Sequence, residues 1–182
     1  DRMKIVMTMM ATMRGFPQIF AGDEMMFVSK DKSQGHGGLR VDFPGGWNGD
    51  KENWFTEEGR KAALTGTDGK PVPAGQVAEL HDFTRKLFQW RKGKSVIHDG
   101  KTLHFLSRDN TYAYFRYNAD EAVFVFINNS RGRKSIPWSH YAEIAEGLHD
   151  GKNVLTGEAV EVNDSTVVGP RKALVVEYKR KK

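Results

Sequence analysis

The sequence predicts an α/β segment followed by an all-β antiparallel half, and two kinds of apolar pattern carry this prediction. In the first half, apolar side chains recur at helical spacing in residues 3–13 and 75–92, on either side of a long loop-rich stretch. After Gly93 the pattern changes to short runs of β-branched and aromatic residues separated by turn residues. We therefore predict two domains, residues 1–95 and residues 96–182.

The first expected element is a helix that leads into a short apolar run. Its stripe at helical spacing consists of Met3, Val6, Met7, Met10 and Met13. Because flexible thioethers usually fill irregular gaps in a core, we expect this stripe to face a core rather than a binding groove. Residues 16–22 lie between glycines and are mostly apolar, which is typical of a buried strand. A helix followed by such a strand favours a parallel sheet covered on both faces.

Residues 23–73 are rich in Gly, Pro and Asp turn signals and predict a long loop. A stretch of this length without regular structure is typical of a functional loop or of disorder. Its apolar residues argue against disorder; they are Leu39, Val41, Phe43, Trp47, Trp54 and Phe55. We therefore expect an ordered surface loop that carries a site, with a short helix opening at Thr56 and running to Leu64.

The clearest helix covers residues 75–92 and has an apolar stripe on one side. The stripe consists of Val77, Leu80, Phe83, Leu87 and Trp90. Basic residues follow the other side, and we interpret them as solvated surface; they are Arg85, Lys86, Arg91, Lys92 and Lys94. This helix is expected to pack on the same sheet as the first.

The net charge of +5 raises the question of a nucleic-acid partner, because clustered Lys and Arg bind phosphate backbones. Much of the excess lies in the tail 179–182 and on the polar side of the helix, so we predict no nucleic-acid partner. One feature is compatible with the opposite view. Tyr112, Tyr114 and Arg116 alternate along one predicted strand, as they would on a base-stacking sheet face, but the surface of a β-sandwich explains them equally well.

The second half predicts several short strands. They are residues 102–106, 111–117, 122–127, 154–162 and 173–178, punctuated by Asp, Asn, Gly and Pro. The run 122–127 is continuously apolar, which is typical of a central strand buried on both faces.

Composition excludes several kinds of site. The chain has no cysteine, so it has neither a disulfide nor a cysteine-based zinc site or nucleophile. Its six histidines show no paired helical spacing, and we predict no metal and no cofactor in this chain. No apolar run approaches the roughly 18 residues of a membrane span, so we predict no span.

Two motifs resemble a known family. Residues 14–24, Arg-Gly-Phe-Pro-Gln-Ile-Phe-Ala-Gly-Asp-Glu, resemble the Gly-x-Pro-x-x-Tyr-x-Gly-x-Glu signature on the eighth barrel strand of the α-amylase family, glycoside hydrolase family 13. Residues 39–47, Leu-Arg-Val-Asp-Phe-Pro-Gly-Gly-Trp, are similar to the Arg-x-Asp-Phe-Pro-Gly-Gly-Trp loop of neopullulanases and cyclomaltodextrinases. Residues 88–91 and 155–157 also fit that family. The signature Tyr is replaced here by Phe20, so a hydroxyl contact of relatives is missing.

The resemblance implies a fold and an activity. The fold is the last strand and helices of a (β/α)8 barrel, followed by an antiparallel β-sandwich called domain C. The activity is retaining hydrolysis of α-1,4 links in maltodextrin, cyclodextrin or pullulan. In this family the three catalytic acids follow earlier barrel strands, and the last of them belongs to an Asn-His-Asp motif that this chain lacks. We therefore expect no catalytic residue here and an inactive chain whose N-terminal barrel is its missing partner.

The same resemblance assigns roles in the site loop. Loops at the C-terminal ends of barrel strands face the sugar cleft, which makes Arg40, Asp42, Phe43 and Trp47 the expected substrate-binding residues. Arg40 and Asp42 would bond hydroxyls, and the aromatic rings would pack on a glucose face. Alternatively, Arg40 pairs with Asp42 or Glu24 and Trp47 only anchors the loop. The family pattern uses Glu24 mainly as structural support of the site.

Three further expectations complete this interpretation. The alternative to a hydrolase fragment is a non-catalytic module whose β half binds carbohydrate or stabilises the barrel. Apolar faces of an incomplete barrel would invite self-association, so a homo-oligomer is expected. Relatives allow a calcium ion in the full-length parent and suggest a periplasmic location.

Overall fold

The computed structural model describes residues 1–27, 32–40, 64–65, 71–72 and 74–181. The contacts within the chain group its residues into two compact units. One unit is formed by residues 1–17 together with residues 85–182, and the other by residues 18–84. The two units are described separately below.

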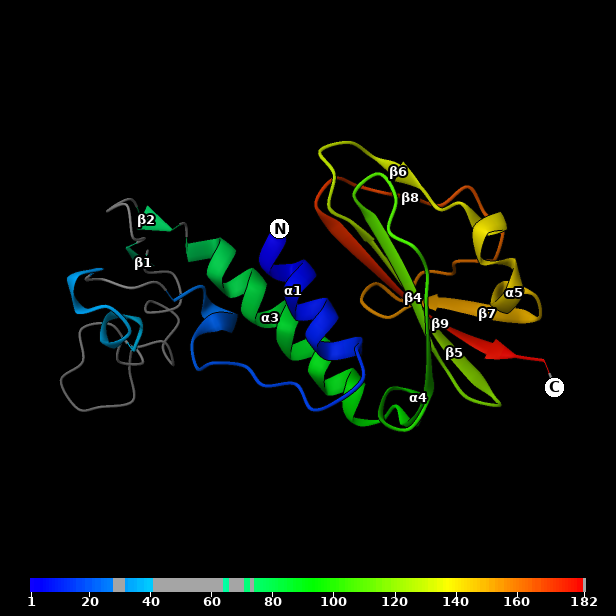
Figure 1. Ribbon diagram of the computed structural model, residues 1–182, viewed down its shortest axis with the longest axis horizontal. Coiled ribbons are helices and arrows are strands. Elements are labelled where there is room, and N and C mark those ends of the chain that lie inside the picture. The colour runs from blue at the N-terminus through cyan, green and yellow to red at the C-terminus, as the bar shows by residue number, and fades with distance from the viewer. Residues whose placement is uncertain (28–31, 41–63, 66–70, 73, 182) are drawn as a thin grey trace. The chain divides into compact units, whose positions relative to one another are not determined.

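The larger unit is built on a five-stranded antiparallel sheet (Figure 1). In spatial order its strands are β3 (Lys101–His104), β4 (Thr111–Tyr117), β5 (Glu121–Asn128), β9 (Lys172–Arg180) and β7 (Leu148–Asn153). A separate two-stranded ribbon pairs β6 (Lys134–Ser135) with β8 (Val167–Val168). The predicted all-β antiparallel domain is thereby confirmed.

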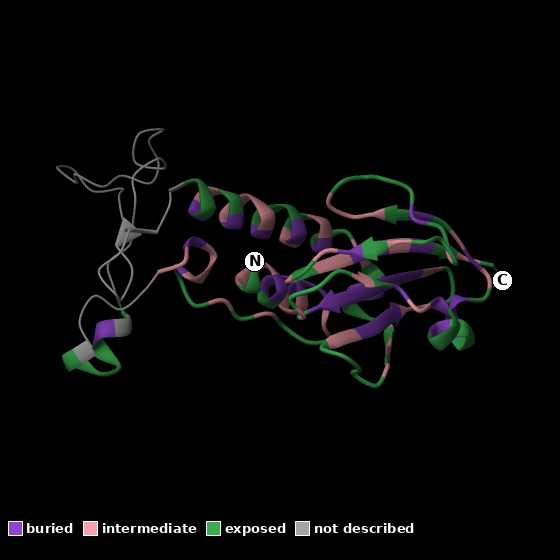
Figure 2. Cartoon of the chain, turned by 90° about the horizontal axis from the view of Figure 1, so that it is seen from above, coloured by how far each residue is buried: buried purple, intermediate pink, exposed green. Residues whose placement is uncertain are grey.

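The central position of β5 follows from its sequence. All residues from Ala122 to Asn128 are buried, and β5 pairs with β4 on one side and β9 on the other. Figure 2 shows buried residues running along these central strands. Alternate side chains point to opposite faces of a sheet, so an apolar residue is needed at every position when both faces are covered. The prediction of a central strand over 122–127 is confirmed.

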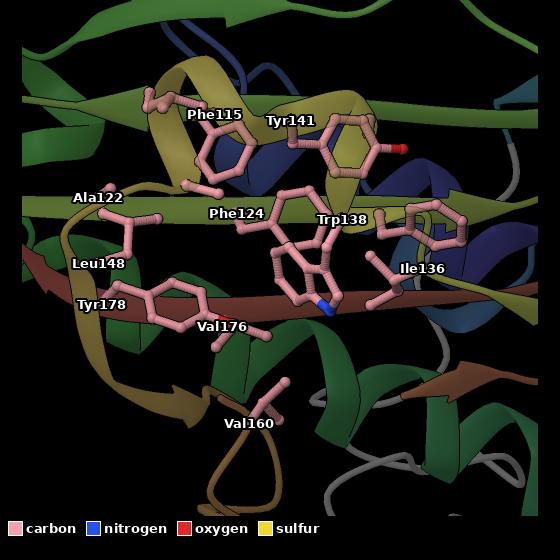
Figure 3. Close-up of a cluster of buried hydrophobic side chains, with 14 of the residues drawn as sticks. Phe115, Ala122, Phe124, Ile136, Trp138, Tyr141, Leu148, Val160, Val176 and Tyr178 are labelled. Carbon is pink, nitrogen blue, oxygen red and sulfur yellow. The ribbon is translucent and has the colours of Figure 1, made fainter. Parts of the chain in front are cut away.

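One face of the sheet carries an aromatic cluster (Figure 3). Phe115 and Phe124 stack with ring centroids 4.6 Å apart, and Trp138 lies 5.0 Å from Phe124. Trp138 belongs to a short 3-10 helix, η4 (Trp138–Tyr141), which continues into α5 (Ala142–Ala145). Burial of large aromatic side chains of this kind dominates the stability of a small domain.

The opposite face is covered by helices α1 (Arg2–Thr12) and α4 (Ser95–His98). Ile5 from α1 and Val96 and Ile97 from α4 pack on alternate residues of the central strands, including Val123 and Val125. The predicted first helix is confirmed, and its methionine stripe is buried only in part: Met7 is buried, whereas Val6 is 46% exposed. Thr8 and Thr12 are buried as well, and each hydroxyl bonds a carbonyl one turn back along α1.

Helix α3 (Ala74–Lys92) confirms the helix predicted over residues 75–92. Val77, Leu80 and Leu87 of its apolar stripe are buried.

The strand predicted over residues 154–162 is wrong. The chain turns directly after β7, because the Asn153 side-chain oxygen accepts the backbone N–H groups of Leu155 and Thr156 at 2.9 and 3.3 Å. Gly157 follows with φ +78°, in the left-handed region. The preceding segment β7 forms the edge strand in its place, with a bulge between His149 and Lys152.

The strand predicted over residues 16–22 is also wrong. Residues 16–20 have no regular structure, and Phe16 is fully exposed while Phe20 is 55% exposed. A parallel strand needs neighbouring strands for its backbone hydrogen bonds, and in the part of the chain that the structure describes none pairs with this segment. The barrel part of the predicted fold class therefore stays a prediction.

Apart from the first part of α3, the unit of residues 18–84 contains only short elements in its described part. They are the 3-10 helices η1 (Asp23–Met25), η2 (Lys32–Gln34) and η3 (Gly37–Leu39), and the ribbon of β1 (Leu64–Thr65) with β2 (Pro71–Val72). The short helix predicted from Thr56 falls on residues outside the described ones, apart from Leu64, which belongs to β1.

Candidate functional site

Glu24 lies in a tight turn whose geometry requires Gly22. Gly22 has φ +100°, and a Cβ atom there would come 2.1 Å from the Phe27 ring. The Glu24 carboxylate accepts the Gly22 N–H at 3.1 Å, and Phe27 N–H also bonds the Gly22 carbonyl at 3.0 Å. Met25 is fully buried against Val77 and anchors this turn on the start of α3. The Glu24 side chain thus bonds the backbone of its own turn.

Arg40 is the second predicted site residue that the structure describes. It is exposed and follows η3, where its N–H bonds the Gly37 carbonyl at 3.0 Å. Glu24 and Arg40, both in the described part, form no ion pair with each other. The other predicted sugar contacts, Asp42, Phe43 and Trp47, lie outside the described residues. The substrate-binding roles therefore stay predictions.

Arg91 holds the segment that leads toward this turn. Its guanidinium donates to the carbonyl oxygens of Ala11 at 2.7 Å and Gly15 at 2.8 Å, and more weakly to Met13 at 3.5 Å. Ala11 belongs to the last turn of α1, where four carbonyl oxygens have no partner within the helix and a cation is favoured by the helix dipole, and Met13 and Gly15 directly follow the helix. Burial lowers the pKa of Arg91. The interpretation of Arg91 as solvated surface is wrong, since the side chain is only 6% exposed.

Lys94 also forms an ion pair and is not only solvated surface. Its ammonium lies 2.5 Å from the Glu177 carboxylate, which accepts the Trp90 indole N–H at 3.1 Å as well. Burial alone would raise the pKa of Glu177, but the bonds from Lys94 and Trp90 outweigh it and hold the pKa below its usual value. The end of α3 is thereby fastened to β9.

The strand face that favoured nucleic-acid binding is covered. Tyr114 and Arg116 are both 0% exposed beneath α1 and α4. Arg116 donates to the Ile97 carbonyl at 2.8 Å and to the Thr102 hydroxyl, and burial lowers its pKa, with the charges of Arg91 and Arg14 adding to the effect. Buried side chains cannot stack on bases, and Tyr112, the third residue of this feature, is only half-buried, so the three residues do not form one open stacking face.

A pocket of about 410 Å³ opens on the β domain and was not anticipated from the sequence. Its lining joins Phe105 and Pro137 to Tyr141, whose side chain is buried, and to the exposed residues Arg108, Asp109 and His140. The signal that would have indicated it is the run Pro-Trp-Ser-His-Tyr at 137–141, an aromatic cluster in a segment too short for a strand.

Two further findings concern the described residues. Among them, no group of three or more His, Cys, Asp and Glu side chains is arranged to hold a metal ion. None of the described helices is long and apolar enough to cross a membrane.

Residues 102–177 match the family described as the cyclo-malto-dextrinase C-terminal domain. This match covers most of β3 and β9 and all of β4, β5 and β7.

Solved structures share the fold. The trehalose-6-phosphate hydrolase of Bacillus licheniformis is 22% identical with a TM-score of 0.63, over 98% of this chain and 39% of that one. The trehalulose synthase of Pseudomonas mesoacidophila MX-45 is 18% identical with a TM-score of 0.62, over 99% and 38%. An α-amylase of Anoxybacillus is 17% identical with a TM-score of 0.59, over 99% and 32%. The chain thus spans about a third to two fifths of these proteins.

The sheet order, the covered faces and the family match all concern the same stretch of chain. Residues 102–177 are therefore similar in sequence to a cyclo-malto-dextrinase C-terminal domain, and the chain shares its fold with these solved structures.

Proposed function

We propose that this chain is the C-terminal part of a retaining α-glucan hydrolase that acts on α-1,4 links of maltodextrin, cyclodextrin or pullulan. The observation that carries the proposal is the match of residues 102–177 to the cyclo-malto-dextrinase C-terminal domain. The neopullulanase-like loop at residues 39–47 supports the same substrate class independently, because it lies outside the matched segment.

In this proposal the chain supplies sugar contacts but not the bond-breaking groups. Retaining hydrolysis needs a nucleophilic carboxylate and an acid/base carboxyl about 5 Å apart. The Glu24 carboxylate is occupied by the Gly22 N–H, which suits a residue that shapes its turn better than one that donates a proton to a leaving group. Arg40, Asp42, Phe43 and Trp47 would contact the glucan, and the acids would come from a preceding barrel.

The test compares this 182-residue chain with the longer protein of the same reading frame. Both are assayed for reducing-sugar release from maltoheptaose, cyclodextrin and pullulan, with trehalose 6-phosphate as the competing substrate. We expect activity on the glucans in the longer protein alone. Activity of the chain by itself, or a longer protein that cleaves only trehalose 6-phosphate, contradicts the proposal.

A second function is a non-catalytic module that binds carbohydrate. The observation that favours it is the pocket beside Tyr141, which combines apolar and polar lining. It predicts glucan binding by a longer protein that shows no hydrolysis of any of these substrates.

A further inference from the structure

We infer that the pocket beside Tyr141 binds a small organic anion, of the phosphomonoester kind, through the basic side chains of Arg108 and Lys134. The site lies on the β domain and does not depend on the proposed hydrolase activity. Its volume of about 410 Å³ falls within the range of small-ligand sites. A phosphate group alone leaves much of this space unfilled, so the ligand also carries an organic body.

Three basic side chains from three separate segments line the pocket. Arg108 comes from the turn between β3 and β4, Lys134 from β6 and His140 from η4. The acid in the described lining is Asp109. Among the described residues, neither Arg108 nor Lys134 forms an ion pair with Asp109 or with any other acid. Their charges are therefore available for charge-assisted hydrogen bonds to an anion.

Further cations lie close to these residues. Arg131 and Arg133 directly precede Lys134 and are exposed. Burial lowers the pKa of Arg171, and the nearby charges of Arg2 and Arg131 lower it further. Like charges held this close together raise the local positive potential, which attracts anions.

The apolar part of the lining is packed in place. Tyr141 is buried, and its ring packs edge-on against Phe105 at 4.8 Å and lies 5.4 Å from Phe124 (Figure 3). Leu106, also in the lining, is 81% exposed. An organic body covers Leu106 and packs on Phe105, which gives apolar contacts that an inorganic ion cannot make.

The turn that carries Arg108 has a fixed backbone. Asp109 and Asn110 both have positive φ, +49° and +58°, which is typical of a two-residue type I′ turn. The turn is closed by the Thr111 N–H to the Arg108 carbonyl at 2.7 Å and by the reverse bond at 3.1 Å. Asparagine tolerates positive φ, so Asp109→Asn removes the acid from the lining and keeps the turn.

The test is a titration of the 182-residue chain with phenyl phosphate, followed by two-dimensional amide NMR. We expect chemical-shift changes at residues 105–111 and 134–141, with a Kd of about 1 mM. Phenol and inorganic phosphate each supply only one part of this probe. Both should bind at least about five-fold more weakly, because one lacks the charge and the other lacks the apolar body.

Charge variants separate the roles of the lining residues. Arg108→Met and Lys134→Met should each raise the Kd for phenyl phosphate about five- to ten-fold, because each removes a charge-assisted bond. Asp109→Asn should lower the Kd about three-fold, since it removes a negative charge that repels the probe. Lys101→Met is the matched control, because it removes an exposed cation outside the lining, and its Kd should stay within about 1.5-fold.

Three outcomes overturn the inference. They are an unchanged Kd in both Arg108→Met and Lys134→Met, shift changes confined to other residues, and equal affinity for phenyl phosphate and for phenol or inorganic phosphate. Displacement of the probe by an equal concentration of maltoheptaose also contradicts it and favours the carbohydrate-binding module. Hydrolysis of glucans by the longer protein does not report on this pocket, so failure of the anion site leaves the proposed hydrolase untouched.

Discussion

The hydroxyl groups of Thr12 and Tyr114 lie 2.5 Å apart and join helix α1 to strand β4 across 102 sequence positions. The Thr12 hydroxyl also donates to the Thr8 carbonyl at 2.6 Å, so the Tyr114 hydroxyl serves as its donor. Both side chains are buried. This bond fixes the position at which α1 packs on the sheet.

Removing this bond should destabilise the domain measurably. Tyr114→Phe leaves the Thr12 hydroxyl without its donor, and we expect the free energy of unfolding to fall by about 1 kcal/mol. Urea unfolding followed by far-UV circular dichroism measures it. Tyr112 lies in the same strand as Tyr114, and its hydroxyl bonds His104 at the surface. Tyr112→Phe removes this exposed bond and should lower the free energy of unfolding by less than about 0.5 kcal/mol. Equal losses of stability in the two variants would show that the bond to Thr12 contributes no more than the exposed bond to His104.

Arg91→Met should release the end of α1. The Ala11 and Gly15 carbonyls would lose their donor, and we expect a loss of about 2 to 4 kcal/mol, since a buried acceptor without a partner costs about 1 to 3 kcal/mol. Hydrogen exchange should accelerate first in α1. Lys92→Met changes the neighbouring exposed cation and is the control. Unchanged protection of α1 in Arg91→Met would contradict the proposed role of the guanidinium.

Gly151→Ala should strain the edge of the sheet. A Cβ atom at Gly151 would come 1.9 Å from the Val160 carbonyl oxygen and 2.3 Å from the Tyr178 ring, so backbone must move. We expect a loss of about 1 to 3 kcal/mol in thermal or urea unfolding. Gly132→Ala is the matched control, because no atom lies within 4 Å of its added methyl group. A loss of the same size at Gly132 would point to chain entropy rather than to crowding.

The pair of Lys94 and Glu177 should make stability depend on acid pH. The pKa of Glu177 is lower in the folded chain than in the unfolded one, so its contribution is present above the unfolded pKa of about 4.3 and is lost as the pH falls through the folded value. Lys94→Met removes the first of the bonds that lower this pKa. The pH dependence of unfolding below about pH 5 should therefore be weaker in Lys94→Met. An identical acid profile in both proteins would rule out this contribution.

The exposed rings of Phe16 and Phe20 should promote association between copies of the chain. Sedimentation velocity across a dilution series should show a concentration-dependent mass. The double variant Phe16→Ser, Phe20→Ser should shift the chain toward the monomer. A wild-type monomer at every concentration would reject the expected homo-oligomer.

The local sequence pattern predicted the central strands of the sheet. It did not predict the side-chain hydrogen bonds that hold neighbouring segments in place. The apolar runs at 111–117 and 122–127 predicted β4 and β5, because a strand covered on both faces leaves a continuous signature. The burial of Arg91 was missed, since its carbonyl partners lie 76 to 80 positions away and a basic residue near a helix end is usually at the surface.

The candidate site was likewise predicted from the sequence only in part. Motifs singled out Glu24 and Arg40, but the bond between Glu24 and Gly22 depends on a left-handed glycine that no spacing rule reveals. Tyr141 was missed because its position depends on rings from three separate segments, those of Phe105, Phe115 and Phe124. Such a site becomes visible only once the strands are assembled.

The place of β9 between β5 and β7 has a consequence for folding on the ribosome. Among the described strands β9 is the last to be synthesised, yet it lies in the interior of the sheet and links β7 to the rest. Until it emerges, one backbone edge of β5 is unpaired. A nascent domain in this state is a natural substrate for chaperones, and its cooperative closure must wait for the final strand.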